Sequence, residues 1–216
     1  MHSPLHSIAD EVSAFIRSPA GPSSGETFNA LATRLLAAQH ASNPAYAAWC
    51  AASRRPVLQG GPAHLYPAVP TEAFKHAAFS CIPQGSHTTE FHSSGTTAHV
   101  PSRHLHHADS LALYKASALA AFDAHLMRGV VPGGHASASR PILLSLTPPL
   151  DAAPRSSLVH MIHWAIQRHG GPGSGFVGRR GPDGSWEIDA QAALATFASA
   201  RATRQAVVLM GTAFNL

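Results

Sequence analysis

The sequence has little charge, little cysteine and no long hydrophobic run. Charged residues make up only 12% of the chain against 45% hydrophobic residues, a balance typical of a globular protein and not of a disordered one. No apolar run approaches the ~20 residues that a helix needs to cross a bilayer. The N-terminus also lacks the charged and apolar segments of a secretory signal. We therefore expect a soluble cytoplasmic protein without a membrane span.

Cysteines and clusters of basic residues are equally scarce. Cys50 and Cys81 are the only cysteines, too few for a disulfide framework in 216 residues, so both are expected to be reduced thiols. The formal net charge of +4 mildly favours anionic ligands, but the chain has no run of Lys or Arg and no basic-aromatic stripe. Nucleic acid is therefore not an expected partner.

The most informative stretch places hydroxyl side chains on both sides of a glycine, in the order Ser93-Ser94-Gly95-Thr96-Thr97. Glycine lets the backbone pass close to a ligand, and successive N–H groups in such a turn form a concave anion site. Hydroxyl groups can donate to phosphate oxygens, and one of them can reach a bound Mg²⁺. A turn of this composition suits a polyphosphate, although an ordinary surface loop has the same composition.

The first 80 residues are predicted to form a mainly helical N-terminal segment. Apolar residues recur at helical spacing between residues 5 and 16, and a second helix is expected after Glu26. Asn43-Pro44 is typical of the cap and first turn of a third helix. Thr71 is expected to cap a short fourth helix.

Residues 81–216 are predicted to alternate strands and helices. Strands are expected at 88–92, 141–146 and 206–210, and helices at 109–127, from 158 and from Asp189. The second and third strands are continuous apolar runs, which are typical of strands buried on both faces. The alternation predicts an α/β fold with an at least partly parallel sheet.

Six further motifs accompany the glycine turn in a fixed order. They are Gln39-His40-x-x-Asn43-Pro44-x-Tyr46-x-x-Trp49-Cys50, Val69-Pro70-Thr71-Glu72-Ala73-Phe74-Lys75, Ser102-Arg103-His104, Leu113-Tyr114, Ser156-Ser157-Leu158-Val159-His160-Met161 and Met210-Gly211-Thr212-Ala213-Phe214. Together with the glycine turn, this set resembles the acyl-protein synthetases, the LuxE-like branch of the adenylate-forming enzymes, over roughly residues 25–216. The resemblance implies the N-terminal part of the family's large domain. Residues 81–216 would then be an incomplete α/β nucleotide-binding domain in one structural unit with residues 1–80.

The resemblance also implies a reaction. It suggests that a carboxylic acid, in this branch a fatty acid, is joined to the α-phosphate of ATP as an acyl adenylate and then transferred to a protein thiol. The implied partners are the acid and an acyl-accepting or reductase protein. Ser93, Ser94, Gly95, Thr96 and Thr97 are expected to hold the β- and γ-phosphates, with Thr97 or Thr96 near Mg²⁺.

Three further residues complete the expected site. Many family members continue after the turn with a glycine and a nearby lysine, whereas this chain has Ala98 and, farther on, Arg103. The guanidinium of Arg103 either supplies the missing cation, since it can grip phosphate oxygens in bidentate fashion, or forms a surface ion pair. His104 fits the family's Ser-Arg-His pattern and is expected near ATP. At a predicted strand-to-helix turn, either His160 contacts the substrate carboxylate, or Ser156 caps the helix and His160 packs in the interior.

Two other patterns are expected to be structural. The glycines from Gly173 to Gly178 satisfy the dinucleotide pattern but follow a predicted helix and not a strand, so a turn is expected there. Residues 104–107 contain three histidines without the spacing of a known zinc motif. The start of a helix with solvated histidines is the expected structure of that segment.

The end of the sequence suggests a second function. The chain stops four residues after Thr212, just beyond a predicted buried strand whose covering helix is missing. This position suggests a truncated enzyme. The alternative to an acyl-activating enzyme is therefore a phosphate-binding or interaction module that retains the glycine turn but has no catalytic activity.

Overall fold

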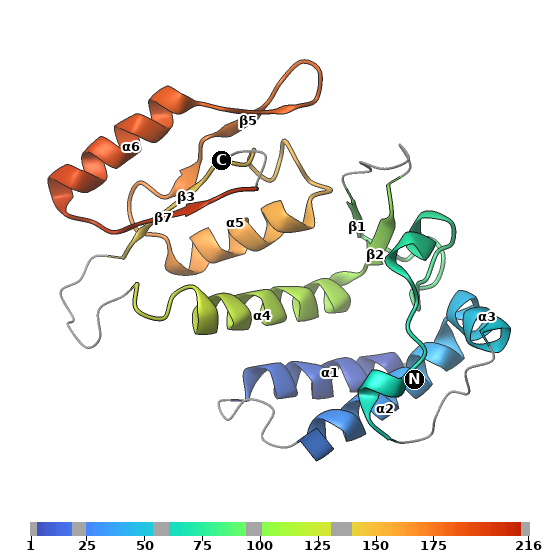
Figure 1. Ribbon diagram of the computed structural model, residues 1–216. Coiled ribbons are helices and arrows are strands. Elements are labelled where there is room, and N and C mark those ends of the chain that lie inside the picture. Colours follow the sequence, from blue (N-terminus) through green and yellow to red (C-terminus); the bar gives the residue numbers. More distant parts are fainter. Residues whose placement is uncertain (1–3, 19–24, 54–60, 94–100, 131–139, 213–216) are drawn as a thin grey trace. The chain divides into compact units, whose positions relative to one another are not determined.

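The computed structural model describes residues 4–18, 25–53, 61–93, 101–130 and 140–212. It separates into two compact units, Met1–Ser117 and Ala118–Leu216, and the boundary falls inside helix α4 (Ala108–His125). Helices and several small sheets are present together, which confirms the predicted mixed α/β class (Figure 1). No helix in the described ranges is both long and apolar enough to span a bilayer.

Three α-helices and two short 3₁₀ helices occupy most of the first unit. They are α1 (Pro4–Arg17), α2 (Gly25–Ser42), α3 (Pro44–Ala52), η1 (Ala63–Leu65) and η2 (Thr71–Lys75). The predicted cap of α3 is confirmed, because the Asn43 side chain accepts the backbone N–H of Tyr46 at 3.0 Å. The predicted cap of the short helix is wrong: Thr71 is its first residue, and Pro70 before it provides no side-chain acceptor.

A small core holds α2 and α3 together. Leu36, Tyr46 and Cys50 are buried, and Trp49 packs against them from the same helix as Tyr46. The Tyr46 hydroxyl donates to the carbonyl of Pro67 at 2.8 Å, which ties the following loop to this core. Burial, with the neighbouring Cys50 thiol, raises the pKa of Tyr46 to about 12. Tyr46 therefore acts as a neutral hydrogen-bond donor in the core.

A β-hairpin follows the helices in the first unit. Strands β1 (Thr89–His92) and β2 (Arg103–His106) pair antiparallel, with Thr89 opposite His106 and His92 opposite Arg103. The first strand confirms the prediction for residues 88–92. The second strand was not predicted from the sequence.

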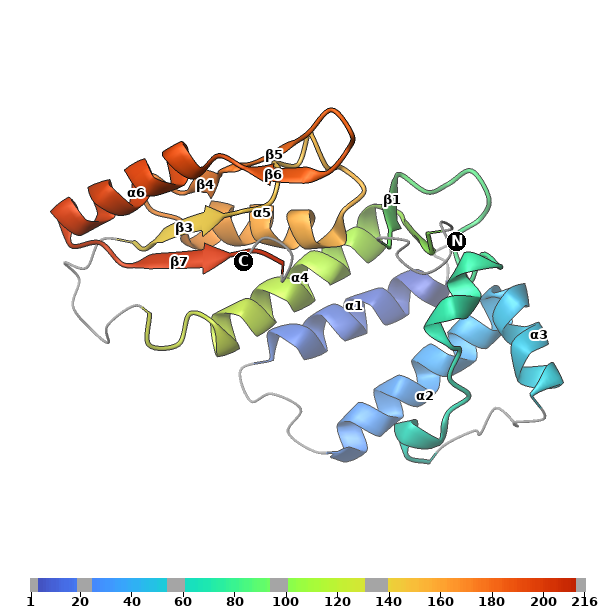
Figure 2. The same ribbon diagram turned by 45° about the horizontal axis from the view of Figure 1, so that its top comes forward.

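The second unit contains a parallel sheet in the order β4-β3-β7, as predicted in part. Its strands are β3 (Ile142–Ser145), β4 (Gly175–Phe176) and β7 (Val207–Met210). Helix α5 (Ser157–His169) connects β3 to β4, and α6 (Ala190–Thr203) precedes β7. The small antiparallel pair β5 (Gly178–Arg180) and β6 (Trp186–Ile188) lies between β4 and α6 in the sequence. Figure 2 shows α6 and α5 on opposite sides of the sheet.

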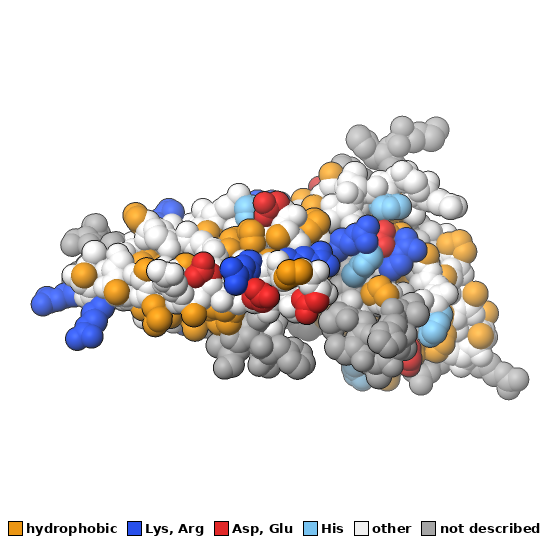
Figure 3. Space-filling view, turned by 90° about the horizontal axis from the view of Figure 1, so that it is seen from above, with side chains coloured by type: hydrophobic (Ala, Val, Ile, Leu, Met, Phe, Trp, Pro, Cys, Tyr) orange, Lys and Arg blue, Asp and Glu red, His pale blue; other side chains and the backbone are white. Residues whose placement is uncertain are grey.

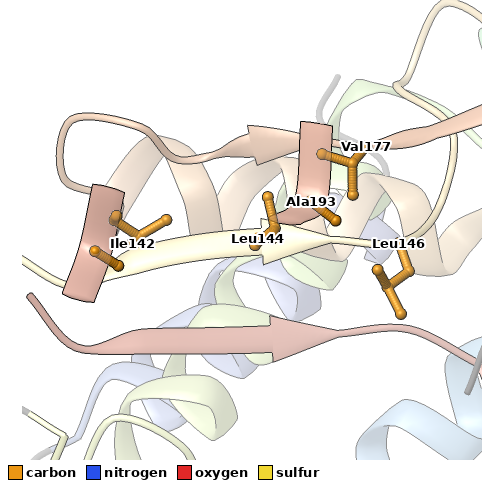
Figure 4. Packing of buried hydrophobic residues seen from close by; sticks show 6 residues of the cluster. Ile142, Leu144, Leu146, Val177 and Ala193 are labelled. Carbon is orange, nitrogen blue, oxygen red and sulfur yellow. The ribbon is translucent and has the colours of Figure 1, made fainter. Parts of the chain in front are cut away.

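Helix α6 covers one face of the sheet through its small residues. Ala193 and Ala200 of the helix pack on the alternate side chains of β3, Ile142 and Leu144, and Val177 closes the same cluster (Figure 4). All four residues of β3 are buried, so its apolar run was interpreted correctly. Asp189 caps α6, as predicted, by accepting the N–H of Ala192 at 2.9 Å.

The predicted burial of the last strand is wrong. Val207 packs on the α6 cluster, but Leu209 on the same face of β7 is 43% exposed. The strand lies at the edge of the parallel sheet and has no neighbour beyond it among the described residues. An apolar run alone does not show whether a strand is central or at an edge, because the run is the same in both places.

Gly178 offers a test of this packing. A Cβ at this position would lie 2.3 Å from the carbonyl carbon of Thr147, whereas a Cβ on Gly175 would meet nothing within 4 Å. Neither glycine has a positive φ, so the two substitutions differ only in steric room. We expect Gly178→Ala to lower the free energy of unfolding by about 1–3 kcal/mol and Gly175→Ala to change it by less than about 0.5 kcal/mol, measured by urea denaturation. Equal effects of the two variants would contradict the described contact between β5 and Thr147.

Candidate functional site

The open end of the β1–β2 hairpin is closed by two serines. The backbone N–H of Ser93 donates to the carbonyl of Ser102 at 3.1 Å, and the N–H of Ser102 donates to the Ser93 hydroxyl at 2.9 Å. This exchange fixes the two points from which the connecting segment, residues 94–101, begins and ends. The predicted phosphate-binding residues Ser94, Gly95, Thr96 and Thr97 lie outside the described residues. Ser93 is therefore the described member of the predicted turn.

Arg103 lies at the base of this segment and is held by a carboxylate. Its Nε donates to Oε1 of Glu90 at 2.6 Å, and its Nη2 lies 3.4 Å from Oε2 of the same side chain. Nε2 of His92 lies 2.7 Å from Glu90 Oε1 and donates to it, because an ionised carboxylate only accepts. The Arg103 side chain is 61% exposed, against 22% for the Glu90 side chain. The carboxylate of Glu90 thus contacts both Arg103 and His92 on one face of the hairpin.

The pKa of Glu90 reflects this arrangement. The hydrogen bond from Arg103, and after it the one from His92, lowers that pKa from its ordinary value of 4.5 to about 2. Glu90 is therefore an anion across the whole range of pH in which proteins bind nucleotides. Sequence reasoning missed Glu90 and His92. The only signal in the sequence was their separation by two residues, which places both on one face of a strand.

His104 lies on the other face of the hairpin. Its ring stacks on Phe74 with centroids 4.9 Å apart, and its Nε2 lies 3.2 Å from the Ser102 hydroxyl. Partial burial lowers the pKa of His104, so the imidazole is neutral at pH 7. His104 can contribute a polar contact near the turn but no positive charge.

The other two histidines of the segment have structural contacts. His106 packs against the rings of Phe91 and Tyr114, with centroids 5.0 and 6.1 Å away, and these two rings also contact each other at 5.7 Å. His107 precedes α4, where its Nδ1 accepts the N–H of Ser110 at 3.1 Å and its own N–H donates to the Ser110 hydroxyl at 3.0 Å. This reciprocal exchange is a capping box in which histidine takes the place of serine. The expected helix start with solvated histidines is thus wrong for His104 and His106, which belong to β2.

The described residues provide no ready-made metal site. No group of three or more His, Cys, Asp or Glu side chains in the described ranges is arranged to hold an ion. Thr97, the expected contact of Mg²⁺, lies outside these ranges. Basic and acidic side chains are interspersed on the face drawn in Figure 3, without a large field of one sign.

His160 lies in the second unit, on the first turns of α5. The Ser156 hydroxyl caps this helix by accepting the N–H of Val159 at 3.3 Å, as expected for a structural role. Nε2 of His160 lies 2.9 Å from the carbonyl oxygen of Pro154, and its ring makes an edge contact with Trp164 at 5.6 Å. The ring is therefore fixed in orientation. The structure brings Ser93, Arg103 and the neighbours of Arg103 together in one unit and places His160 in the other.

The glycine pattern from Gly173 to Gly178 begins in a turn and continues as strands, so the predicted turn covers only its first part. It contains β4 and the first residue of β5, and an antiparallel strand pair follows it instead of a helix. A dinucleotide site requires a helix N-terminus at this point.

Comparison of the chain with protein-family models, with curated proteins and with solved structures found no match.

The pKa of Glu90 predicts how the hairpin responds to acid. Because the folded-state pKa of about 2 lies below the ordinary 4.5, the Glu90 contacts contribute fully above pH 4.5 and are lost as the pH falls toward 2. We expect Glu90→Gln to lower the free energy of unfolding by about 1 kcal/mol at pH 7, the usual upper range for exposed ion pairs. Urea denaturation between pH 7 and pH 3 should show this difference shrinking below pH 4.5. A difference that stays constant with pH would contradict the described pairing.

Proposed function

We propose that this chain activates a carboxylic acid with ATP and Mg²⁺, forming an acyl adenylate that is passed to a protein thiol. The observation that carries the proposal is the open end of the β1–β2 hairpin. There Ser93 and Ser102 close the hairpin on one face and the exposed Arg103 side chain lies on the other, at the point where the hydroxyl-rich segment from residue 94 connects the strands. Hydroxyls, backbone N–H groups and a guanidinium are the groups that bind polyphosphate.

The chemistry of adenylation needs little more from the protein than position and positive potential. A carboxylate oxygen attacks the α-phosphorus of ATP while the bond to pyrophosphate breaks, so two anions must be held together and in line. In this proposal Ser93 to Thr97 hold the β- and γ-phosphates, Thr97 or Thr96 contacts Mg²⁺, and Arg103 neutralises the outer phosphates. His104, neutral at pH 7, supplies a hydrogen bond near ATP.

His160 is proposed to contact the carboxylate of the substrate. It lies on the first turn of α5, the helix that comes after β3 in the chain, and helix N-termini favour anions. Nε2 of its ring lies 2.9 Å from the carbonyl oxygen of Pro154, which fixes the orientation of the imidazole. The implied acid is fatty, the implied acceptor is a protein thiol or a reductase partner, and the implied compartment is the cytoplasm. These assignments come from the family resemblance.

A second candidate is a phosphate-binding module without turnover. The contact between Glu90 and Arg103 supports it, because part of the guanidinium is already occupied by a carboxylate. The absence of a lysine after the turn points the same way.

Exchange of labelled pyrophosphate into ATP separates the two candidates. We expect the purified 216-residue chain with Mg²⁺ to exchange pyrophosphate only when a suitable carboxylic acid is added, because exchange requires reversible formation of the acyl adenylate. A panel of short, medium and long-chain acids identifies the substrate class. A folded chain that binds ATP without acid-dependent exchange would support the binding module instead.

Arg103 is tested by its preference for the outer phosphates. We expect Arg103→Ala to weaken Mg-ATP binding about tenfold, the equivalent of ~1.4 kcal/mol for a charge-assisted contact, and to leave AMP binding nearly unchanged. Isothermal titration calorimetry measures both affinities. Arg179→Ala is the matched control, because Arg179 is similarly exposed, at 67%, and its Nε donates to Glu187 on another antiparallel strand pair. Equal losses of ATP and AMP affinity in Arg103→Ala would show that Arg103 supports the fold only.

A further inference from the structure

Glu90 contacts Arg103 through one edge of the guanidinium. The contact uses Nε and Nη2, at 2.6 and 3.4 Å from the two carboxylate oxygens. A guanidinium has five N–H donors in a planar fork, so this side-on contact leaves both hydrogens of Nη1 and one of Nη2 for another oxyanion. With the side chain 61% exposed, these donors are accessible to a ligand.

The register of the hairpin explains why the carboxylate reaches this edge. Arg103 lies directly opposite His92, and Glu90 is the diagonal neighbour two residues along the same face of β1. Oε1 of Glu90 accepts from both basic side chains, at 2.6 Å from Arg103 and 2.7 Å from His92. The carboxylate is thus held from two sides, and the guanidinium is held by it in one orientation.

We propose that Glu90 is the positioning residue of the phosphate site: it holds Arg103 through the Nε–Nη2 edge so that the Nη1–Nη2 edge is presented to the outer phosphates of ATP. This role rests on the proposed function, since it needs a phosphate for Arg103 to bind. Arginine loses much rotamer freedom when it binds a ligand, and a partner that restricts it beforehand reduces that cost. Glu90 also keeps the guanidinium from pairing elsewhere on the surface.

The positioning role of Glu90 and simple electrostatics predict opposite changes in the affinity for Mg-ATP when Glu90 is removed. Removing an acidic side chain beside a phosphate site would by charge alone tighten the binding of ATP. If Glu90 positions Arg103, Glu90→Ala instead weakens Mg-ATP binding about fivefold, in the range expected for an arginine that must be ordered on binding. The loss should depend entirely on the presence of Arg103.

A double-mutant cycle measured by calorimetry with Mg-ATP tests this dependence. The proteins are the unaltered full chain, Glu90→Ala, Arg103→Ala and the double variant, with Glu187→Ala as the control for removal of an exposed carboxylate paired with an arginine. We expect Glu90→Ala to weaken binding in the unaltered chain and to have no further effect when Arg103 is already alanine. Glu90→Asp, which keeps the charge on a shorter side chain, should restore part of the affinity. Glu187→Ala should leave the affinity unchanged.

Four outcomes overturn the positioning role. Tighter binding by Glu90→Ala would show that the carboxylate competes with phosphate for Arg103. An equal loss in both backgrounds would show that Glu90 supports the fold of the hairpin and does not act through Arg103. If the folded, unaltered chain does not bind Mg-ATP, the proposed function is overturned together with the positioning role. If the unaltered chain binds ATP and Glu90→Ala binds it with the same affinity, the positioning role alone is overturned.

Discussion

The antiparallel pairing of β1 with β2 is the constraint on which the candidate site depends. Alternate residues of a strand lie on opposite faces, so this one register places Glu90, His92 and Arg103 together on one face. The other face carries Phe91 and His106, which pack against each other with ring centroids 5.0 Å apart. A slip of one residue would move the guanidinium to the aromatic face and separate it from its carboxylate. The chemistry of the hairpin is therefore a consequence of its backbone hydrogen bonds.

The second unit depends on a different constraint, the burial of a single central strand. Because β3 has a strand on each side and all its residues are buried, its polar groups must find partners inside the protein. The hydroxyls of Ser145 and Thr147, both fully buried, lie 2.9 Å apart and satisfy each other. Residues 146–156 connect this strand to α5, which begins after its capping residue Ser156 and carries His160 on its first turn. The candidate contact for the acid is thus positioned by the core of this unit.

Local signals were predicted well from the sequence, and relations between distant segments were not. Each of the capping residues Asn43, Ser156 and Asp189 accepts the backbone N–H of the residue three positions later. Both partners of the hydrogen bond are therefore close together in the sequence and can be recognised from it. The strand β2 was missed because its residues favour no strand until they pair with β1. Glu90 escaped notice for the same reason, since its partner Arg103 is 13 residues away and meets it only in one register. The residues of the glycine turn beyond Ser93 stay a prediction from the sequence.

The position of β7 has a consequence for work with the purified protein. This strand consists of four consecutive apolar residues, and Leu209 is exposed beside backbone groups that have no strand partner among the described residues. Such an edge lacks the charged side chains, proline or bulge that usually prevent a second strand from adding to a sheet. An edge of this kind is the part of a sheet to which a strand of a second molecule adds most readily. It lies in a different unit from the hairpin that carries the candidate site.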